Sequence, residues 1–200
     1  MTRLLIALVA VLWSGAAFAA APTERAIFAM GCFWCAEAAF EGKPGVIKVT
    51  SGYSGGTNAN PVYETAHDFG HAEVIEVVYD PTKTTYEKLL YIFWRNIDPL
   101  TANAQFCDRG AQYRSIIYAV TPQQKAAALA SKVELEKSGR FKKPIVTEIL
   151  DAKPFFPAED YHQDYAVKNP LKYEYYRFGC GRDNRLDEVW GAEARGGAKH

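Results

Sequence analysis

The chain has 200 residues, and its 23 Lys and Arg residues are balanced by 23 Asp and Glu residues. This balance excludes the strongly basic surface that is typical of nucleic-acid-binding domains, so we expect no nucleic-acid partner. Even without a short leader, the chain is long enough for one domain with a substantial core.

The first residues have the pattern of a secretory signal peptide. Arg3 gives a positive start, residues 4–13 are apolar, and residues 17–19 form a small-x-small cleavage pattern. The apolar run is too short for a stable membrane anchor. We therefore expect a cleaved signal peptide over residues 1–19 and an exported, periplasmic protein with a single domain over residues 20–200. An uncleaved anchor is the alternative.

Strand and helix patterns alternate along the rest of the chain. Alternating apolar residues and turn signals predict strands over residues 25–30, 46–53, 72–79, 113–120 and 144–150. Capping residues and apolar faces predict helices over residues 32–41, 84–96 and 122–139. The first six elements run strand, helix, strand, strand, helix, strand, which matches a ferredoxin-like split βαβ unit. We expect an α+β fold, a two-layer sandwich with that unit as its core.

The segment after about residue 151 carries few periodic signals but many aromatic side chains. So many aromatic residues argue against a disordered tail, because such tails are poor in them. We expect this C-terminal segment to wrap the core as a long coil with short helical pieces.

Cys32 stands at the turn from a predicted strand into a predicted helix. A thiol there faces unpaired backbone N–H groups and the positive end of the helix dipole, which favour the nucleophilic thiolate. Phe33 and Trp34 add an apolar wall, and Cys35 follows one turn later. Cys-x-x-Cys is a redox or zinc spacing, but without a second close-spaced pair we expect no metal. A structural cysteine or half of a disulfide is the alternative for Cys32.

Further polar candidates stand near the ends of predicted strands. Glu73 opens an otherwise apolar strand, and in a desolvated pocket a raised pKa would make it an acid near neutral pH. Tyr63 follows a turn, and Asp108 and Tyr113 stand in a polar loop ahead of a strand, where sites collect. Taken alone, each of these residues also fits an ordinary surface turn or strand edge.

Seven short motifs connect the chain to a known family. In chain order they are Gly-Cys-Phe-Trp, Ser-Gly-Tyr-x-Gly-Gly, Asn-Pro-x-Tyr, Gly-His-Ala-Glu, Tyr-Asp-Pro, Asp-x-Gly-x-Gln-Tyr-Arg-Ser and Tyr-His-Gln-Asp-Tyr. One such motif is weak, but seven in order are specific. From about residue 26 to residue 190, the chain resembles the A-type peptide-methionine sulfoxide reductases, which act on the S epimer of the sulfoxide.

The resemblance implies a catalytic role for four residues. Cys32 would attack the sulfoxide sulfur and become a sulfenic acid. Glu73 would give a proton to the sulfoxide oxygen, because an oxide is a poor leaving group until it is protonated. Tyr63 and Tyr113 would hydrogen-bond the same oxygen.

The resemblance also implies the groups that hold the substrate. Phe33 and Trp34 would enclose its methyl group, and Asp108 would stand in the pocket. The substrates would be proteins or peptides that contain methionine sulfoxide, with the free amino acid left open. No cofactor is implied, and we expect a monomer.

A second thiol must convert the sulfenic acid to a disulfide, which a thioredoxin-like dithiol would then reduce. We rank Cys180 first, because a C-terminal segment can reach the pocket. Cys35, where many relatives have Gly, is the close alternative, and Cys107 is third. The expected role is repair of oxidised exported proteins. The alternatives are a disulfide oxidoreductase that uses Cys32 and Cys35, and an exported binding domain with two structural disulfides.

Overall fold

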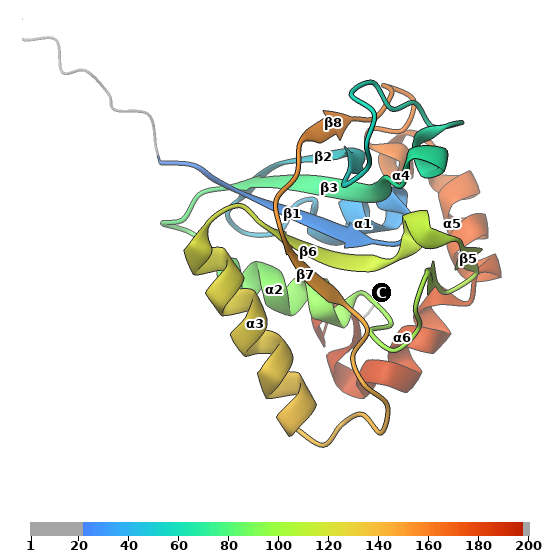
Figure 1. Ribbon diagram of the computed structural model, residues 1–200. Helices are drawn as coiled ribbons and strands as arrows, with labels where there is room; N and C mark the ends of the chain where they lie inside the picture. Colours follow the sequence, from blue (N-terminus) through green and yellow to red (C-terminus); the bar gives the residue numbers. More distant parts are fainter. Residues whose placement is uncertain (1–21, 198–200) are drawn as a thin grey trace, which may run out of the picture.

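The computed structural model describes residues 22–197, and Figure 1 shows a curled sheet with helices packed against it. The predicted signal peptide falls within residues 1–21 and so lies outside the described residues. Among the described helices, none is both long enough and apolar enough to span a bilayer.

The main sheet of the described chain has six strands, which are β1 Glu24–Met30, β2 Val46–Ser54, β3 Ala72–Tyr79, β6 Ser115–Ala119, β7 Glu148–Asp151 and β8 Phe155–Pro157. A separate ribbon is formed by β4 Ala104–Gln105 and β5 Asp108–Arg109. The order in the main sheet is β7-β6-β1-β3-β2-β8. Neighbouring strands are antiparallel except β6 and β7, which are parallel, so the sheet is mixed.

Helices cover the sheet, and within residues 22–197 they are α1 Phe33–Phe40, α2 Tyr86–Arg95, α3 Pro122–Lys137, α4 Tyr165–Lys168, α5 Pro170–Gly179 and α6 Arg182–Trp190. The predicted starts of α2 and α3 are confirmed. The side chain of Thr85 accepts the backbone N–H of Lys88, and that of Thr121 accepts the N–H of Gln124. Each threonine therefore satisfies one N–H that has no partner inside its helix.

Two predicted strands are shorter in the structure. Residues 111–113 form a 3₁₀ turn, so β6 begins only at Ser115. In the last predicted strand, pairing is confined to Glu148–Asp151, where β7 lies parallel to β6. Strand patterns record apolar alternation, whereas the ends of a strand are set by where a partner strand stops.

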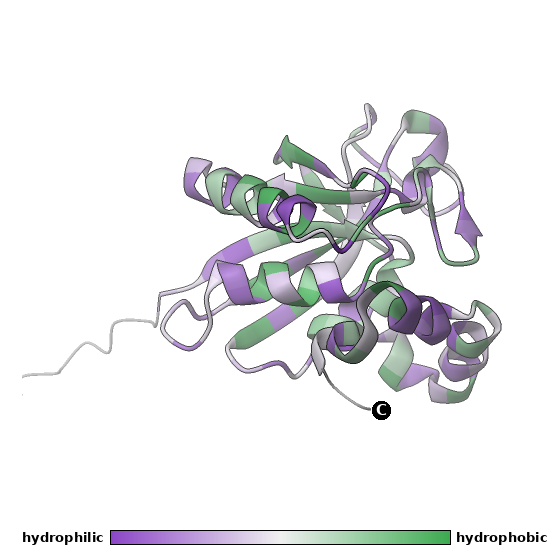
Figure 2. Ribbon diagram, turned by 90° about the horizontal axis from the view of Figure 1, so that it is seen from below, coloured by the Kyte–Doolittle hydropathy of each residue, from purple (hydrophilic) through white to green (hydrophobic). Residues whose placement is uncertain are grey.

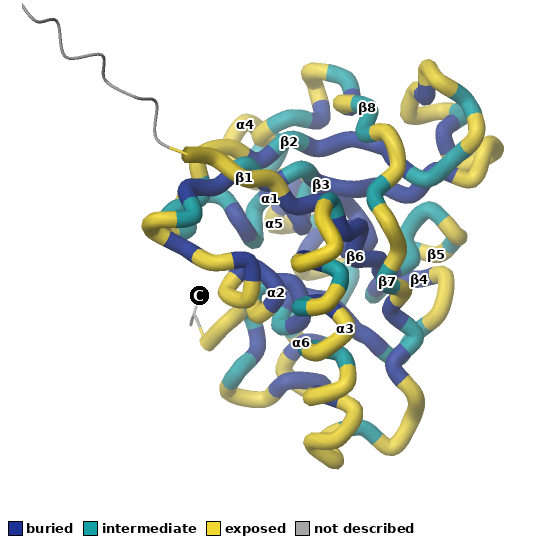
Figure 3. Tube along the Cα trace, turned by 60° about the vertical axis from the view of Figure 1, so that its left-hand side comes forward, coloured by how far each residue is buried: buried dark blue, intermediate teal, exposed yellow. Residues whose placement is uncertain are grey.

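Both faces of the central strand β1 are buried, and Figure 3 shows the sheet mostly in the colour of buried residues. The ring centroid of Phe28 lies 5.5 Å from that of Phe40 in α1 and 5.2 Å from that of Phe93 in α2. Ile27 and Ala29 alternate with Phe28 and belong to a smaller cluster on the other face. Figure 2 shows hydrophilic and hydrophobic bands along the helices, as expected where one side of each helix is buried.

The C-terminal segment is more regular than predicted. Its strand β8 pairs with the end of β2, and the helices α4, α5 and α6 follow in place of a long coil with short helical pieces. In α5, Tyr173 and Arg177 are buried, and the guanidinium group of Arg177 binds the carboxylate of Asp183. Because Arg177 is charged, a hydrophobicity pattern treats its buried position as exposed. The apolar side of α5 is therefore not visible in the sequence, and the helix was not predicted.

Candidate active site

The turn between β1 and α1 positions Cys32. Gly31 has a φ of +80°, and a Cβ atom there would lie 2.4 Å from the Cβ atom of Gln105, so only glycine fits. Cys32 is the N-cap residue of α1 and is 7% exposed. Its sulfur therefore lies at the helix N-terminus, as the sequence predicted, but beneath the surface.

Glu73 stands at the start of β3, which runs antiparallel beside β1. Its Oε2 atom accepts a hydrogen bond of 2.9 Å from the backbone N–H of Phe33. Glu73 is 5% exposed, and this burial raises its pKa to about 8, although the hydrogen bond from Phe33 acts in the opposite direction. Its carboxyl group is therefore mostly protonated at neutral pH and can serve as an acid beside Cys32.

Cys32 and Cys35 are buried, free cysteines that interact with each other. The Cys32 thiol lowers the pKa of Cys35 to about 6, and the charges of Arg182 and Arg177 act in the same direction. Burial raises the pKa of Cys32 well above its usual value. The neighbouring Cys32 thiol and the two arginines thus favour one negative charge on this pair of thiols, from which the nucleophile can be drawn.

A cavity of about 340 Å³ opens beside Glu73 and is lined by Tyr53, Tyr63 and Tyr113. Burial raises the pKa of Tyr63 and of Tyr113, so both hydroxyl groups stay protonated and can donate hydrogen bonds. Glu159 fixes one wall, because its carboxylate accepts the hydroxyl of Tyr53 and the backbone N–H of Tyr63, each at 2.9 Å. The cavity can thus offer several donors to one small polar group.

Phe33 and Trp34 pack against aromatic residues of the C-terminal segment. The ring centroid of Phe33 lies 4.8 Å from that of His162 and 6.4 Å from that of Tyr63. Trp34 stacks on Tyr165 with centroids 3.7 Å apart, and its Nε1 donates to Nδ1 of His162 at 3.0 Å. Phe33 therefore supports the cavity wall from behind Tyr63, while one face of Trp34 is covered by the chain itself.

Asp108 in β5 faces Tyr176 in α5. The hydroxyl of Tyr176 donates to Oδ2 of Asp108 at 2.5 Å, and it lies near the sulfur of Cys32, whose pKa it lowers. The ring of Tyr176 meets Trp34 edge-on, with centroids 5.9 Å apart. Burial raises the pKa of Asp108. Tyr176 therefore connects three residues that the sequence placed in the site.

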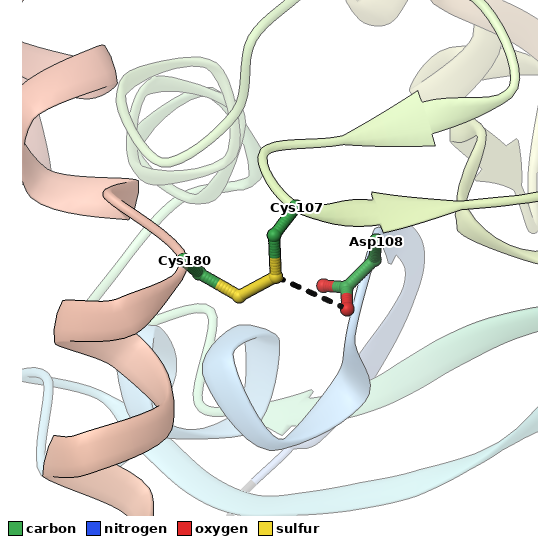
Figure 4. Close-up of side chains that lie close together, drawn as sticks. All are labelled: Cys107, Asp108 and Cys180. Atoms are coloured by element: carbon green, nitrogen blue, oxygen red, sulfur yellow. Dashed lines mark hydrogen bonds between the residues drawn. A yellow bond between two sulfur atoms is a disulfide. The ribbon is translucent and has the colours of Figure 1, made fainter.

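A disulfide joins Cys107 to Cys180 across 73 residues. Figure 4 shows this bond between the C-terminal helices and the ribbon, with the carboxylate of Asp108 next to Cys107. Cys180 is the C-cap residue of α5, so the bond fastens the end of that helix to the ribbon that carries Asp108.

A sequence profile of the family described as peptide methionine sulfoxide reductase matches residues 24–194. The chain belongs to this family. It is accordingly an oxidoreductase that reduces methionine sulfoxide in a thiol-dependent reaction, and the resemblance found in the seven motifs is confirmed.

Relatives of this reductase match it over most of its length. A peptide methionine sulfoxide reductase MsrA from Bacillus velezensis is 51% identical over 169 residues, which are 84% of this chain and 96% of that protein. MsrA 2 from Caulobacter vibrioides is 49% identical over an alignment of 200 positions that covers 96% of this chain and 100% of that protein. The crystal structure of Mxr1 from Saccharomyces cerevisiae in reduced form is 30% identical, with a TM-score of 0.68 over 78% of this chain and 91% of that one.

The reductase fold brings some of the predicted site residues to one cavity and leaves others behind it. Glu73, Tyr63 and Tyr113 line the cavity, whereas Cys32 and Asp108 are not among the described residues that line it. Glu73 connects the two groups through its contact with the first turn of α1. The sulfur and its acid are therefore neighbours, but the sulfur has no open surface on the cavity.

Four residues of the site were missed by sequence reasoning: Tyr53, Glu159, His162 and Tyr176. Tyr53 and His162 stand within two of the seven motifs and could have been singled out there. Glu159 and Tyr176 carry no such signal, because their partners lie far away in the sequence.

Within the described chain, two side-chain groups could converge on a cation, namely Cys107 with Asp108 and Cys180, and Glu37 with Glu41 and Asp164. The sulfurs of the first group are joined in a disulfide and are not thiolate ligands. Neither group includes Cys32 or Glu73. A metal ion held by either group would therefore not be coordinated by the sulfur of Cys32.

Proposed function

We propose that this reductase acts on the S epimer of peptide-bound methionine sulfoxide, with Cys32 as nucleophile and Glu73 as acid. The observation that carries the proposal is the hydrogen bond between Glu73 and the N–H of Phe33, because it holds a protonated carboxyl group next to the sulfur of Cys32. The same assays, run with the free amino acid, test whether free methionine sulfoxide is also a substrate.

In the proposed reaction, Cys32 passes its proton to the neighbouring Cys35 and attacks the substrate sulfur. The sulfoxide oxygen takes a proton from Glu73 and is held by the hydroxyl groups of Tyr63 and Tyr113. The oxygen is transferred to Cys32. The products are methionine and a sulfenic acid on Cys32.

The choice of epimer follows from two fixed points on the substrate. In the proposed complex, Phe33 and Trp34 would enclose the methyl group and the tyrosines would hold the oxygen, while Asp108 lies outside the present cavity and contacts Tyr176. With the methyl group and the oxygen placed, only one epimer presents its sulfur to Cys32. A small, mostly apolar pocket with a few convergent polar groups suits such a ligand.

We propose Cys35 as the thiol that resolves the sulfenic acid. It attacks the sulfur of Cys32, and the products are a Cys32–Cys35 disulfide and water. The two free thiols lie one turn apart at the start of α1 and affect each other's pKa, which supports this step. Cys180, which we ranked first from the sequence, is bonded to Cys107 and has no free thiol in this state.

The disulfide then requires a dithiol reductant, and we propose a thioredoxin-like protein. The leader pattern of residues 1–19 supports export, so the enzyme would repair oxidised proteins in the periplasm as a monomer with no membrane anchor. Because that compartment is oxidising, the reductant would be a local one supplied through the membrane.

The deciding experiment is dithiothreitol-driven reduction of the separated S and R epimers of a methionine sulfoxide peptide by the mature protein and by Cys32→Ser. Turnover of the S epimer alone, lost in the variant, supports the reaction, the epimer and the nucleophile together. Failure of folded, reduced protein to turn over either epimer contradicts the proposal and favours a disulfide oxidoreductase.

We also infer that four strands of the sheet derive from a ferredoxin-like split βαβ unit. The order β6-β1-β3-β2 with antiparallel neighbours supports this inference. In that unit a helix follows the first strand and another follows the third, as α1 follows β1 and α2 follows β3.

A further inference from the structure

Helix α5 presents one of its sides to the cysteines of the chain. Tyr173, Tyr176 and Cys180 are spaced three and four residues apart, so they share one side of the helix. Tyr173 lies near Cys35 and Tyr176 near Cys32, where each affects the pKa of the thiol, and Cys180 is bonded to Cys107. One helix therefore contacts both free thiols and carries half of the disulfide.

Tyr176 contacts residues that the proposed substrate would also contact. Its hydroxyl donates to Oδ2 of Asp108 at 2.5 Å and lies near enough to the Cys32 thiol to affect the pKa of that thiol, and its ring meets Trp34 edge-on. Cys32 is almost completely buried and does not border the cavity beside Glu73. In this position Tyr176 lies beside Cys32 and Asp108, two residues that the proposed substrate would contact, and Cys32 keeps only 7% exposure.

The rest of the chain holds α5 from one side only. Leu171, Tyr175 and Phe178 on its other side are 85%, 83% and 86% exposed. The disulfide pins the C-terminal end of α5 to the residue next to Asp108, four residues beyond Tyr176. Cys107 is exposed, so an external thiol can attack this bond.

We propose that the Cys107–Cys180 disulfide is a redox latch that seats Tyr176 on Cys32 and closes the site, and that its reduction opens the site to substrate. This inference rests on the proposed role of Cys32. A dithiol reductant gives two electrons and two protons to the bond and leaves as a disulfide, and Cys107 and Cys180 become thiols. The freed end of α5 then lets Tyr176 move away from Cys32 and Asp108.

A latch of this kind admits substrate only where reductant is present. Without reductant, one turnover would leave Cys32 as a sulfenic acid or a disulfide that cannot be recycled. A closed site also shields Cys32 from oxidation beyond the sulfenic acid, which thiols cannot reverse.

The test measures access to Cys32 and does not depend on turnover. In Cys35→Ser with the Cys107–Cys180 bond formed, as verified by mass, Cys32 is the free thiol that iodoacetamide can alkylate. Its alkylation rate is followed by mass spectrometry across pH, because the plateau at high pH reports access and the midpoint reports the pKa. The same rate is measured after removal of the latch in Cys35→Ser/Cys107→Ser/Cys180→Ser. In a further sample of Cys35→Ser, a phosphine reduces the Cys107–Cys180 bond, which gives the open state without further substitution. Peptide mapping then distinguishes alkylation of Cys32 from alkylation of the two new thiols.

We expect the plateau rate to rise at least tenfold when the bond is absent or reduced. Tyr176→Ala in Cys35→Ser with the bond intact should give a similar rise, whereas Tyr175→Ala, on the exposed side of α5, should give none. Equal plateau rates with and without the bond overturn the proposal, as does a rise in Tyr176→Ala alone, because Tyr176 would then shield Cys32 without a latch. Loss of the reductase reaction with the rate difference preserved would overturn the proposed function but not the latch.

Discussion

The carboxyl group of Glu73 accepts the backbone N–H of Phe33, the residue that follows the nucleophile Cys32 in the chain. An acid on β3 is thereby tied to the first turn of α1, and its distance from the sulfur is set by the backbone. Burial raises the pKa of Glu73 to about 8, so the group tied there carries a proton at neutral pH.

Glu73→Gln keeps the size of the side chain but removes the transferable proton. We expect kcat for the S sulfoxide to fall about 10²- to 10⁴-fold, the usual contribution of a general acid, with little change in KM. Glu76→Gln on the same strand is the matched control, because Glu76 pairs with Arg25 at the other end of β1. A kcat within a few-fold of the parent in Glu73→Gln would remove Glu73 from the mechanism.

The pH dependence of kcat/KM should be bell-shaped. The reaction needs Glu73 protonated, so activity falls as the pH rises through about 8. It also needs the Cys32–Cys35 pair ionised, so activity rises with pH through about 6, the lowered pKa of Cys35. Steady-state rates in constant-ionic-strength buffers measure both limbs. In Glu73→Gln the alkaline limb should disappear from the residual activity, and its persistence would assign it to another group.

Cys35→Ser should separate chemistry from recycling. Because Cys32 alone forms the sulfenic acid, one methionine per enzyme should still appear in a single-turnover assay once the Cys107–Cys180 bond has been reduced. Multiple turnover with a thioredoxin-like reductant should be lost, since no neighbouring thiol resolves the sulfenic acid. Quantified methionine release measures both quantities.

Cys107→Ser/Cys180→Ser is the counterpart to Cys35→Ser. It leaves the Cys32–Cys35 pair intact, so we expect recycling with the same reductant to continue. If this variant stops after one turnover while Cys35→Ser recycles, the resolving thiol belongs to the C-terminal pair instead.

Gly31→Ala should destabilise the protein more than Gly42→Ala. Both glycines have positive φ, which costs an L-residue about 1–2 kcal/mol. At Gly42 nothing lies within 4 Å of the added Cβ, whereas at Gly31 it meets the side chain of Gln105 at 2.4 Å. This contact should add about 1–3 kcal/mol of overpacking, measured by urea unfolding. Equal losses would mean that Gln105 gives way at no cost.

The sequence by itself determined the local elements and the chemistry of the candidate residues. Apolar alternation located β1 and β3, and threonine caps located the starts of α2 and α3, because these signals arise within a few residues. Seven motifs in order were enough to indicate the family. They also named Cys32 and Glu73 before any distance between them was known.

The tertiary structure decided how these residues meet. Arg182 and Arg177 contribute to the lowered pKa of Cys35, and Tyr176 lies near the thiol of Cys32. These groups lie more than a hundred residues away in the sequence, on helices that the sequence pattern did not predict. Local patterns carry no information about such contacts, because burial and charge at a thiol are set by whichever distant segments pack on it.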